Sequence, residues 1–201
     1  MTSIKKAAGV ADMGKIIITE NVSLDGVVQD PAGEEGFGHG GWAGQLNGQD
    51  REEWAAVLAG EAQSAAALLL GRRSEEWFAA RWLSRSGPWA DRLNGLPKYV
   101  VSSTLAAPRW SSATVLRGDV VSEVSQLKQG LDGDIVVYAS FQLARTLLEH
   151  GLADELRLMI FPVVLGEGGR LFGAATTMKA MRLIAARTVG ESLAFLAYAP
   201  A

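Results

Sequence analysis

The feature that most constrains the fold is the alternation along the chain of short β-rich runs with helical patterns. Strands that are separated by helices pair in parallel, so this order predicts an α/β domain with a largely parallel, helix-covered sheet. The last two runs are joined through Val189-Gly190-Glu191 and predict an antiparallel hairpin at one edge. The predicted strands are 15–22, 67–70, 98–103, 113–116, 134–138 and 156–160, and the hairpin comprises 182–187 and 193–198.

Capping signals set the predicted starts of the intervening helices. Asp50 with Glu53 three residues later is typical of a capping box, and apolar residues at helical spacing follow it. Ser74 is expected to begin a helix that runs to about Trp82. Asp119 and Ser140 are expected to cap two further helices, which stop at the glycines 130 and 151.

Length and composition indicate one folded domain. The chain has 201 residues, of which 48% are hydrophobic, and this is enough apolar surface for a single core. Residues 1–12 are expected to be a flexible N-terminal extension without the apolar core of a secretory signal, and 13–201 to be the domain. Because no run of about 18 apolar residues occurs, no membrane span is expected, and a cytoplasmic location is the expectation.

Charge and residue usage exclude several function classes. A net charge of −3 argues against a protein held mainly on nucleic-acid phosphates. The absence of cysteine excludes disulfides, thiolate metal sites and a cysteine nucleophile. Two histidines are too few for a histidine metal cluster, so no metal is expected.

A predicted strand runs directly into Gly71-Arg72-Arg73-Ser74 and a helix. Unpaired N–H groups at a helix N-terminus attract anions, glycine permits close approach, and arginine grips phosphate bidentately. This pattern favours a phosphate site at Gly71, Arg72, Arg73 and Ser74. The alternative is an ordinary glycine turn with a serine cap and two solvated arginines.

Two further strand ends carry candidate ligand groups. Ser102 and Ser103 follow one predicted strand, although consecutive hydroxyl residues are also an ordinary loop opening. Tyr138-Ala139-Ser140-Phe141 joins another strand to a helix. Since ligands of open α/β sheets lie beyond the carboxyl ends of strands, two neighbouring helix starts there would hold a pyrophosphate together.

Asp25 and Trp42 are candidates on the substrate side. Asp25 follows the first strand and could hydrogen-bond a heterocycle or relay a proton; the equal alternative is a turn before Gly26. Trp42 lies in a glycine-rich stretch and could stack on a planar ring, although core packing is the simpler role. The glycines from 36 to 41 fit G-x-G-x-x-G by letter, but no strand precedes them directly, which excludes a Rossmann fingerprint.

Five segments in this order resemble the dihydrofolate-reductase-like fold, and more specifically the reductase domain at the C-terminus of bacterial riboflavin-biosynthesis deaminase-reductases and its stand-alone relatives. The resemblance covers about residues 15–200 and implies a three-layer fold with a mostly parallel mixed sheet, flanking helices and a C-terminal antiparallel hairpin. The segments are Ser23-Leu24-Asp25-Gly26, 70–74, 98–103, 147–156 and 161–172.

The resemblance implies an NADPH site and a homodimer. It assigns the 2′-phosphate or pyrophosphate to the turn at Gly71, the adenosine phosphate to Ser102 and Ser103, and the nicotinamide side to Ala139, Ser140, Phe141 and Gln142. Relatives usually have glycine where this chain has Ala139 or Ser140, and a Cβ there can obstruct close approach. On the substrate side it implies Asp25, Trp42, Gly166 and Gly168, with the stretch 26–48 as a mobile flap.

The implied activity is NADPH-dependent reduction of a pterin-like or pyrimidine-like heterocycle or a ribosylamino compound, as in riboflavin biosynthesis. The deaminase activity of the flavin enzymes is excluded, since its zinc site needs cysteines that this chain lacks. Two alternatives stay open: a non-catalytic nucleotide-binding or ligand-binding relative, suggested by the altered Ala139-Ser140 turn, and a partner-binding module that uses the stretch 33–48.

Overall fold

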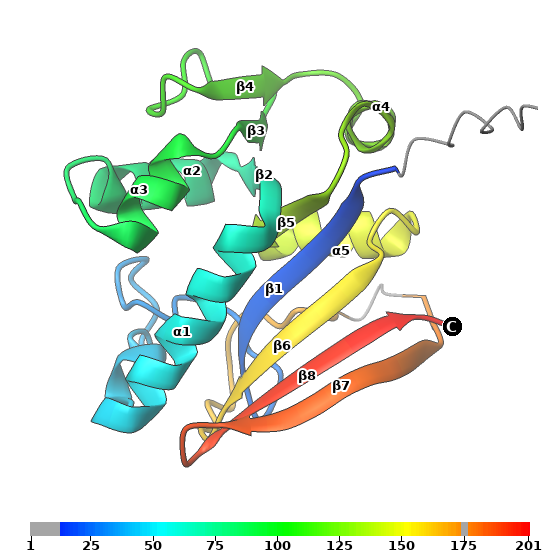
Figure 1. Cartoon of the computed structure of the whole chain (residues 1–201). Coiled ribbons are helices and arrows are strands. Elements are labelled where there is room, and N and C mark those ends of the chain that lie inside the picture. The colour runs from blue at the N-terminus through cyan, green and yellow to red at the C-terminus, as the bar shows by residue number, and fades with distance from the viewer. Residues whose placement is uncertain (1–12, 174–176) are drawn as a thin grey trace, which may run out of the picture.

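The computed structural model describes residues 13–173 and 177–201, so the predicted N-terminal extension 1–12 lies outside the described residues. Within them, eight strands form one sheet in the order β4-β3-β2-β5-β1-β6-β8-β7 (Figure 1). The strands are β1 (Lys15–Ser23), β2 (Ala65–Gly71), β3 (Lys98–Val101), β4 (Ala113–Leu116), β5 (Asp134–Tyr138), β6 (Glu155–Phe161), β7 (Met181–Val189) and β8 (Leu193–Pro200).

The pairing confirms the predicted sheet. β1 lies between β5 and β6 and is parallel to both, and β2, β3 and β4 continue the parallel array. β8 is antiparallel to β6 and to β7, which forms the C-terminal edge hairpin. As a result, the carboxyl ends of six parallel strands lie along one edge of the sheet.

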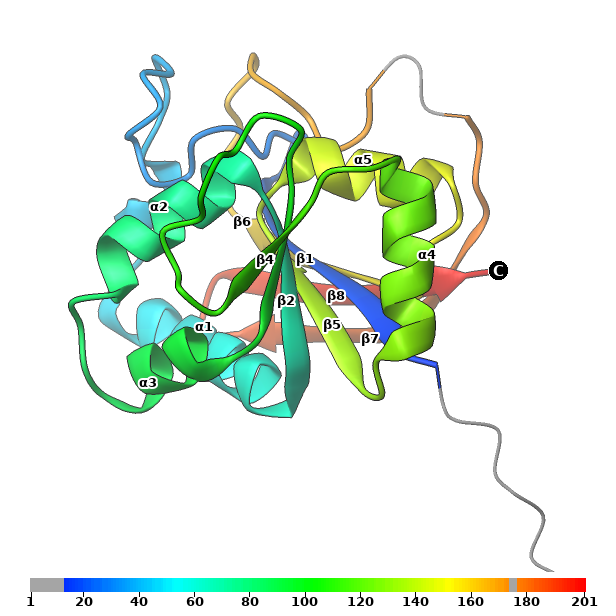
Figure 2. The same cartoon turned by 90° about the horizontal axis from the view of Figure 1, so that it is seen from above.

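Helices cover both faces of the sheet (Figures 1 and 2). The helices α1 (Gly48–Ser64), α2 (Arg72–Trp82) and α3 (Pro88–Gly95) enclose one apolar core with β2 and β5. The helices α4 (Val120–Gly130) and α5 (Phe141–Glu149) enclose a second core on the opposite face, where the side chains of Ile16 and Ile18 on β1 are buried. No helix among the described residues is long and apolar enough to cross a membrane.

A third core lies between α1, a short 3-10 helix η1 (Trp42–Gln45) and the strands β6, β8 and β7. Trp42 is only 3% exposed and donates a hydrogen bond from its Nε1 to the carbonyl of Gln29, at 2.8 Å. Its ring packs edge-on against Phe161 at 5.2 Å between centroids. The structure therefore favours the packing role for Trp42 over the stacking platform.

The predicted capping box at the start of α1 is wrong. Asn47 is the N-cap residue, and its side chain accepts a hydrogen bond from the backbone N–H of Asp50. Asp50 lies in the first turn and accepts hydrogen bonds from the backbone N–H groups of Glu191 and Ser192 in the β7–β8 turn. Glu53 accepts a hydrogen bond from Gly190 N–H in the same turn, so both carboxylates anchor the hairpin.

Two other helix predictions need correction. α2 begins at Arg72 with Gly71 as N-cap, so Ser74 lies in its first turn rather than capping it. Ser140 holds the N-cap position of α5, but its side chain makes no capping hydrogen bond. α3 was not predicted, because a segment of only eight residues that begins with a proline and ends with a glycine is also typical of a loop.

Candidate functional site

The candidate site residues gather at the carboxyl edge of the sheet because they follow parallel strands. Asp25 follows β1, Arg72 follows β2, Ser102 follows β3 and Ala139 follows β5. β2 and β5 are neighbours in the sheet, and so are β1 and β6. Two groups of predicted residues therefore meet directly, one at the β2–β5 pair and one at the β1–β6 pair.

At the β2–β5 pair, the hydroxyl of Ser140 joins the two helix starts. Its Oγ accepts a hydrogen bond from the backbone N–H of Gly71 at 3.0 Å and lies 2.7 Å from Ser74 Oγ. Neither α2 nor α5 has a side-chain cap hydrogen bond at its N-terminus. Two helix N-termini, each with N–H groups that no side chain caps, thus lie side by side, which is an arrangement suited to anions.

The turn between β5 and α5 adopts a backbone conformation that favours glycine. Ala139 has φ 51° and Ser140 has φ 62°, and both are in the left-handed region. Each non-glycine residue held there costs on the order of 1 kcal/mol. Phe141 is the first residue of α5 and packs partly into the core, while Gln142 is exposed.

The arginines at the start of α2 point into solvent. Arg72 and Arg73 are exposed, and Arg72 pairs with Glu76 one turn further along at 3.3 Å. An exposed pair of this kind contributes little stability, so Arg72 can exchange Glu76 for an anionic ligand at small cost. The predicted phosphate turn therefore offers backbone N–H groups, hydroxyls and two exposed guanidinium groups as donors.

Ser102 and Ser103 occupy the loop after β3, which ends at Val101 rather than at 103 as predicted. The Oγ of Ser102 accepts hydrogen bonds from the backbone N–H groups of Thr104 and Leu105, at 3.3 and 3.0 Å. Ser103 is exposed. Ser102 thus shapes its own turn, and its hydroxyl hydrogen stays available for a ligand.

At the β1–β6 pair, Asp25 holds two loops together. Its Oδ1 accepts hydrogen bonds from the Ser23 hydroxyl at 2.7 Å and from Leu165 N–H at 3.1 Å. Its Oδ2 accepts one from Gly166 N–H at 2.8 Å and lies 3.6 Å from Arg170 Nη2. The Ser23 hydrogen bond, followed by that of the Leu165 N–H, lowers the pKa of Asp25 to about 2.

Asp25 is therefore ionised at neutral pH and acts as an acceptor there. Four groups already surround its carboxylate, which is the arrangement of a turn-stabilising side chain. The low pKa disfavours the predicted proton relay, since an acid of that strength holds no proton to donate near pH 7. The orienting role of Asp25 stays a prediction.

The glycine-rich loop after β1 packs beside this group. Gly168 has φ 113°, and a Cβ on it would come within 2.8 Å of Phe37 Cζ and 2.9 Å of Val27 Cγ1. Glu34 of the same loop pairs with Arg81 of α2. The loop thus contacts both the β6 end and α2, which places it next to the candidate site. Its mobility stays a prediction.

A buried polar cluster under the site was not predicted. Glu61 on α1 is 6% exposed, and its Oε1 accepts hydrogen bonds from Thr19 Oγ1 and Arg157 Nη1 at 3.2 and 3.0 Å. Burial raises the pKa of Glu61 and also that of Tyr138, which ends β5. Glu61 Oε2 and the Tyr138 hydroxyl lack hydrogen-bond partners among the described residues. The sequence feature that could have predicted this cluster is a charged residue, Arg157, within an otherwise apolar strand.

The described residues contain no group of three histidine, aspartate or glutamate side chains that could hold a metal ion. Pockets lie away from the carboxyl edge as well. One lies between α1 and β7 at Glu53, Val57 and Arg187, and the other lies beside α5 and the start of β7. The candidate site is formed by helix starts and loops at the carboxyl edge of the sheet.

Comparison with known structures identifies the fold as dihydrofolate-reductase-like. A putative riboflavin biosynthesis protein from Shewanella sp. PV-4 is 19% identical, with a TM-score of 0.73 over 93% of this chain and 99% of its own. Dihydrofolate reductase from Enterococcus faecalis, solved in complex with NADP(H), is 14% identical, with a TM-score of 0.60 over 94% of this chain and 97% of its own. Acinetobacter baumannii RibD is 15% identical, with a TM-score of 0.65 over 94% of this chain and 58% of its own.

The sequence profile of the RibD C-terminal domain matches residues 14–195, and the chain belongs to that family. The uncharacterized protein YyaP of Bacillus subtilis (strain 168) is 29% identical over 136 residues, which are 65% of this chain and 72% of YyaP. The predicted family and fold are thus confirmed.

Proposed function

We propose that this chain is an NADPH-dependent reductase of a small heterocyclic substrate, pterin-like or pyrimidine-like, or of a ribosylamino compound. The observation that carries the proposal is the meeting of two helix N-termini at the ends of β2 and β5, joined by Ser140. NADP(H) in the Enterococcus dihydrofolate reductase supports the choice of cofactor, since that enzyme shares the fold.

The residues present fit the cofactor's phosphates. Two carboxylates lie beside the donor set at the β2–β5 edge. Glu76 is engaged by Arg72, and the buried Glu75 in the first turn of α2 accepts hydrogen bonds from the backbone N–H groups of Arg109 and Trp110. Arg72 and Arg73 would hold the 2′-phosphate, the N–H groups that begin α2 and α5 the pyrophosphate, and Ser102 and Ser103 the adenosine side. When bound, NADPH supplies a hydride, and the chain's own task is to orient the reactants and exclude water.

On the substrate side, the ionised Asp25 would accept a hydrogen bond from a ring N–H or an amino group. Asp25 also accepts a hydrogen bond from the N–H of Gly166 and so stabilises the loop after β6 next to the proposed substrate position. The glycine-rich loop is anchored through the Glu34–Arg81 pair. In this proposal it would cover the substrate side and limit access of water.

Calorimetric titration with NADPH and NADH tests the proposal. We expect saturable NADPH binding and, for Arg72→Ala, about tenfold or greater weakening for NADPH, because a charge-assisted contact contributes roughly 1.5–3 kcal/mol. NADH affinity should stay nearly unchanged. Arg182→Ala, which removes an exposed arginine on β7, is the matched control. Absence of binding at millimolar NADPH would exclude the proposal.

The Ala139-Ser140 turn favours one alternative, a relative that binds a nucleotide without catalysis. The backbone of both residues is in the left-handed conformation, and both carry a side chain. These side chains restrict how closely a nicotinamide can approach the backbone. The two functions separate in a turnover assay with dihydropterin and aminopyrimidine substrates. Steady NADPH oxidation that Asp25→Asn reduces supports the reductase, whereas binding without oxidation supports the alternative.

A further inference from the structure

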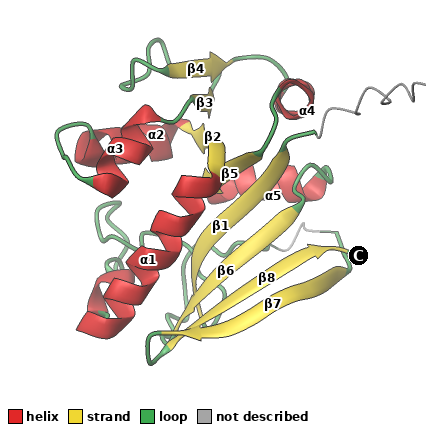
Figure 3. Cartoon of the chain, in the orientation of Figure 1, coloured by secondary structure: helices red, strands yellow, loops and turns green. Residues whose placement is uncertain are grey.

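Glu20 lies on β1 between the two groups of candidate residues. Figure 3 shows β1 flanked by β5, which leads into the turn 139–140, and by β6, which leads into the loop on the substrate side. The pairs of β1 with β5 end at Thr19 and Tyr138, so Glu20 is one position further along, beside the turn. On the other side, Glu20 pairs with Leu158 of β6. Since neighbouring strands are about 4.8 Å apart, Glu20 is within one strand of both groups.

The strand β1 continues beyond the end of β5. It pairs with β6 as far as Ser23 and Phe161, whereas the described residues form no β1–β5 pair after Thr19 and Tyr138. The β5 side of residues 20–23 therefore faces the turn 139–140 rather than a strand. A nicotinamide ring whose pyrophosphate is held at the two helix starts would meet β1 along this stretch, which begins with Glu20.

The carboxyl of Glu20 is buried in apolar surroundings. Glu20 is 4% exposed, and its Oε1 has no hydrogen-bond partner in the part of the chain that the structure describes. Ile16 and Ile18, on the same face of β1, belong to the core under α4 and α5. A buried polar atom without a partner costs free energy and is rare in folded proteins, so its position beside a candidate site points to a role in the chemistry of the ligand.

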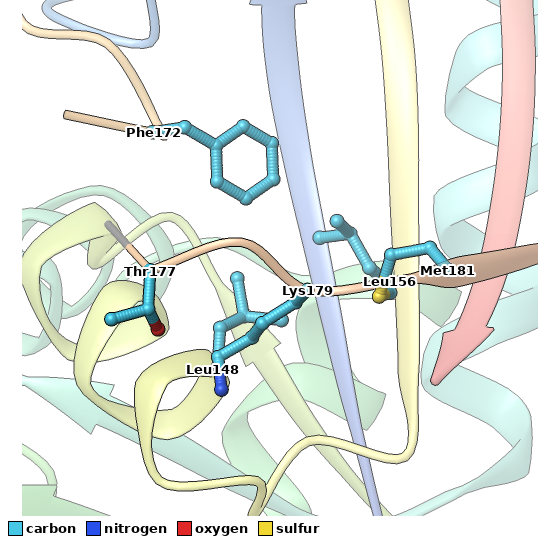
Figure 4. A pocket seen from close by; sticks show the side chains of 6 residues that line it. All are labelled: Leu148, Leu156, Phe172, Thr177, Lys179 and Met181. Carbon is cyan, nitrogen blue, oxygen red and sulfur yellow. The ribbon is translucent and has the colours of Figure 1, made fainter. Parts of the chain in front are cut away.

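The charged side chains of the neighbouring elements have partners of their own. Arg145 on α5 donates to the carbonyls of Leu171 and Arg170, Arg157 on β6 pairs with Glu61 on the opposite face, Lys128 on α4 pairs with Asp154, and Lys179 donates to the carbonyl of Glu149. Lys179 also lines an apolar pocket of about 270 Å³ on the face of Glu20, toward the start of β6 (Figure 4). Burial raises the pKa of Glu20 to about 8, so its carboxyl holds a proton at pH 7.

The two carboxyls near the candidate site therefore suit different tasks. The low pKa of Asp25 leaves it ionised, as an acceptor, whereas Glu20 keeps a proton that it can donate. Reduction of a C=N bond requires both a hydride and a proton. A dihydropterin-like ring contains such a bond, and so does the open imine form of a ribosylamino compound.

We propose that Glu20 is the proton donor of the reduction, an inference that rests on the proposed reductase function. The hydride that the cofactor supplies forms a C–H bond at the carbon of the C=N group. The O–H bond of Glu20 breaks, and its proton forms the N–H bond at the nitrogen. Glu20 is left as a carboxylate and takes up a proton from water before the next turnover.

Carbon NMR of protein labelled at glutamate Cδ tests the position of Glu20 without any substrate, with Glu20→Gln used to assign the signal. The oxidised nicotinamide ring carries a positive charge, and the reduced ring carries none. A positive charge within about 6 Å favours the ionised carboxyl, so the pKa of Glu20 should be lower by about one pH unit or more with NADP⁺ than with NADPH. Equal pKa values in the two complexes overturn the proton donor, whereas failure of both cofactors to bind overturns the reductase itself.

Turnover measures the role of Glu20 in the reaction. Glu20→Gln should lower kcat at least about 100-fold, because general acid catalysis contributes about 10²–10⁴-fold, while NADPH affinity stays within about twofold. Wild-type kcat/KM should fall above about pH 8, where Glu20 loses its proton, and Glu20→Gln should lack this fall. Glu52→Gln, at an exposed position on α1, should keep the wild-type kcat and pH profile. A folded Glu20→Gln with wild-type kcat and pH profile overturns the proton donor and leaves the reductase standing.

Discussion

Glu20 carries a carboxyl that the fold buries, and we expect it to destabilise the protein as the pH rises. Its side chain shares a face of β1 with Ile16 and Ile18. The residue is 4% exposed, and its Oε1 has no hydrogen-bond partner within 13–173 and 177–201. Burial raises the pKa of Glu20 from 4.5 to about 8. In the unfolded chain, the same carboxyl ionises at its ordinary pKa.

The sign and size of the effect follow from proton linkage. Between pH 4.5 and pH 8 the folded state holds a proton that the unfolded state has released, so the free energy of unfolding falls as pH rises. The slope is about 1.4 kcal/mol per pH unit. Two and a half units separate 4.5 from neutrality, which gives a destabilisation of about 3 kcal/mol at pH 7.

Urea unfolding of Glu20→Gln and wild type at several pH values between 4.5 and 8 measures how much Glu20 lowers the free energy of unfolding. We expect the variant to gain about 3 kcal/mol relative to wild type between pH 4.5 and pH 7. Any fixed cost of burying the amide is the same at each pH and cancels from that change. Glu52→Gln, at an exposed position on α1, should show no comparable trend. A wild-type-to-variant difference that stays constant across this range would refute the reasoning.

Three further predictions concern named backbone and carboxylate positions. Ala139→Gly should raise the free energy of unfolding by up to about 1 kcal/mol by relieving a positive φ, whereas Ala144→Gly within α5 should lower it by about 1 kcal/mol in the same urea assay. Gly168→Ala should lower the melting temperature more than Gly36→Ala, because both strain a positive φ but only Gly168 lacks room for a Cβ. Asp50→Ala should speed amide hydrogen exchange in the β7–β8 turn. Its lowered pKa predicts that the stability difference from wild type shrinks as pH falls below 3.8, so a constant difference would contradict the assigned contacts.

Local sequence patterns correctly predicted strand bounds and helix caps that depend on neighbouring residues. β5 was predicted at its observed bounds, and Asp119 caps α4 through a hydrogen bond from the Ser122 N–H, as expected. Parallel pairing also followed correctly from the order of strands and helices, since crossover connections leave few alternatives. The edge on which the candidate residues gather was therefore predictable.

Long-range contacts were not predictable from these patterns. Asp50 looks like a helix cap by sequence, but its partners lie about 140 residues away in the β7–β8 turn. Ser140 likewise looks like a cap, while its hydroxyl instead meets Gly71, 69 residues earlier. The contact between Glu61 and Arg157 spans 96 positions and depends on how α1 crosses the sheet. The hydrogen-bond partner of a polar side chain depends on which residues the fold brings close to it, and local sequence patterns do not contain that information.

The most direct test of the proposed reductase is a crystal structure of this chain soaked with millimolar NADPH. We predict the pyrophosphate at the N-termini of α2 and α5, near Gly71 and Ser140, and the 2′-phosphate within reach of Arg72 or Arg73. Cofactor density at another surface would contradict the account. So would the absence of cofactor density at the carboxyl edge in crystals whose packing leaves that edge open.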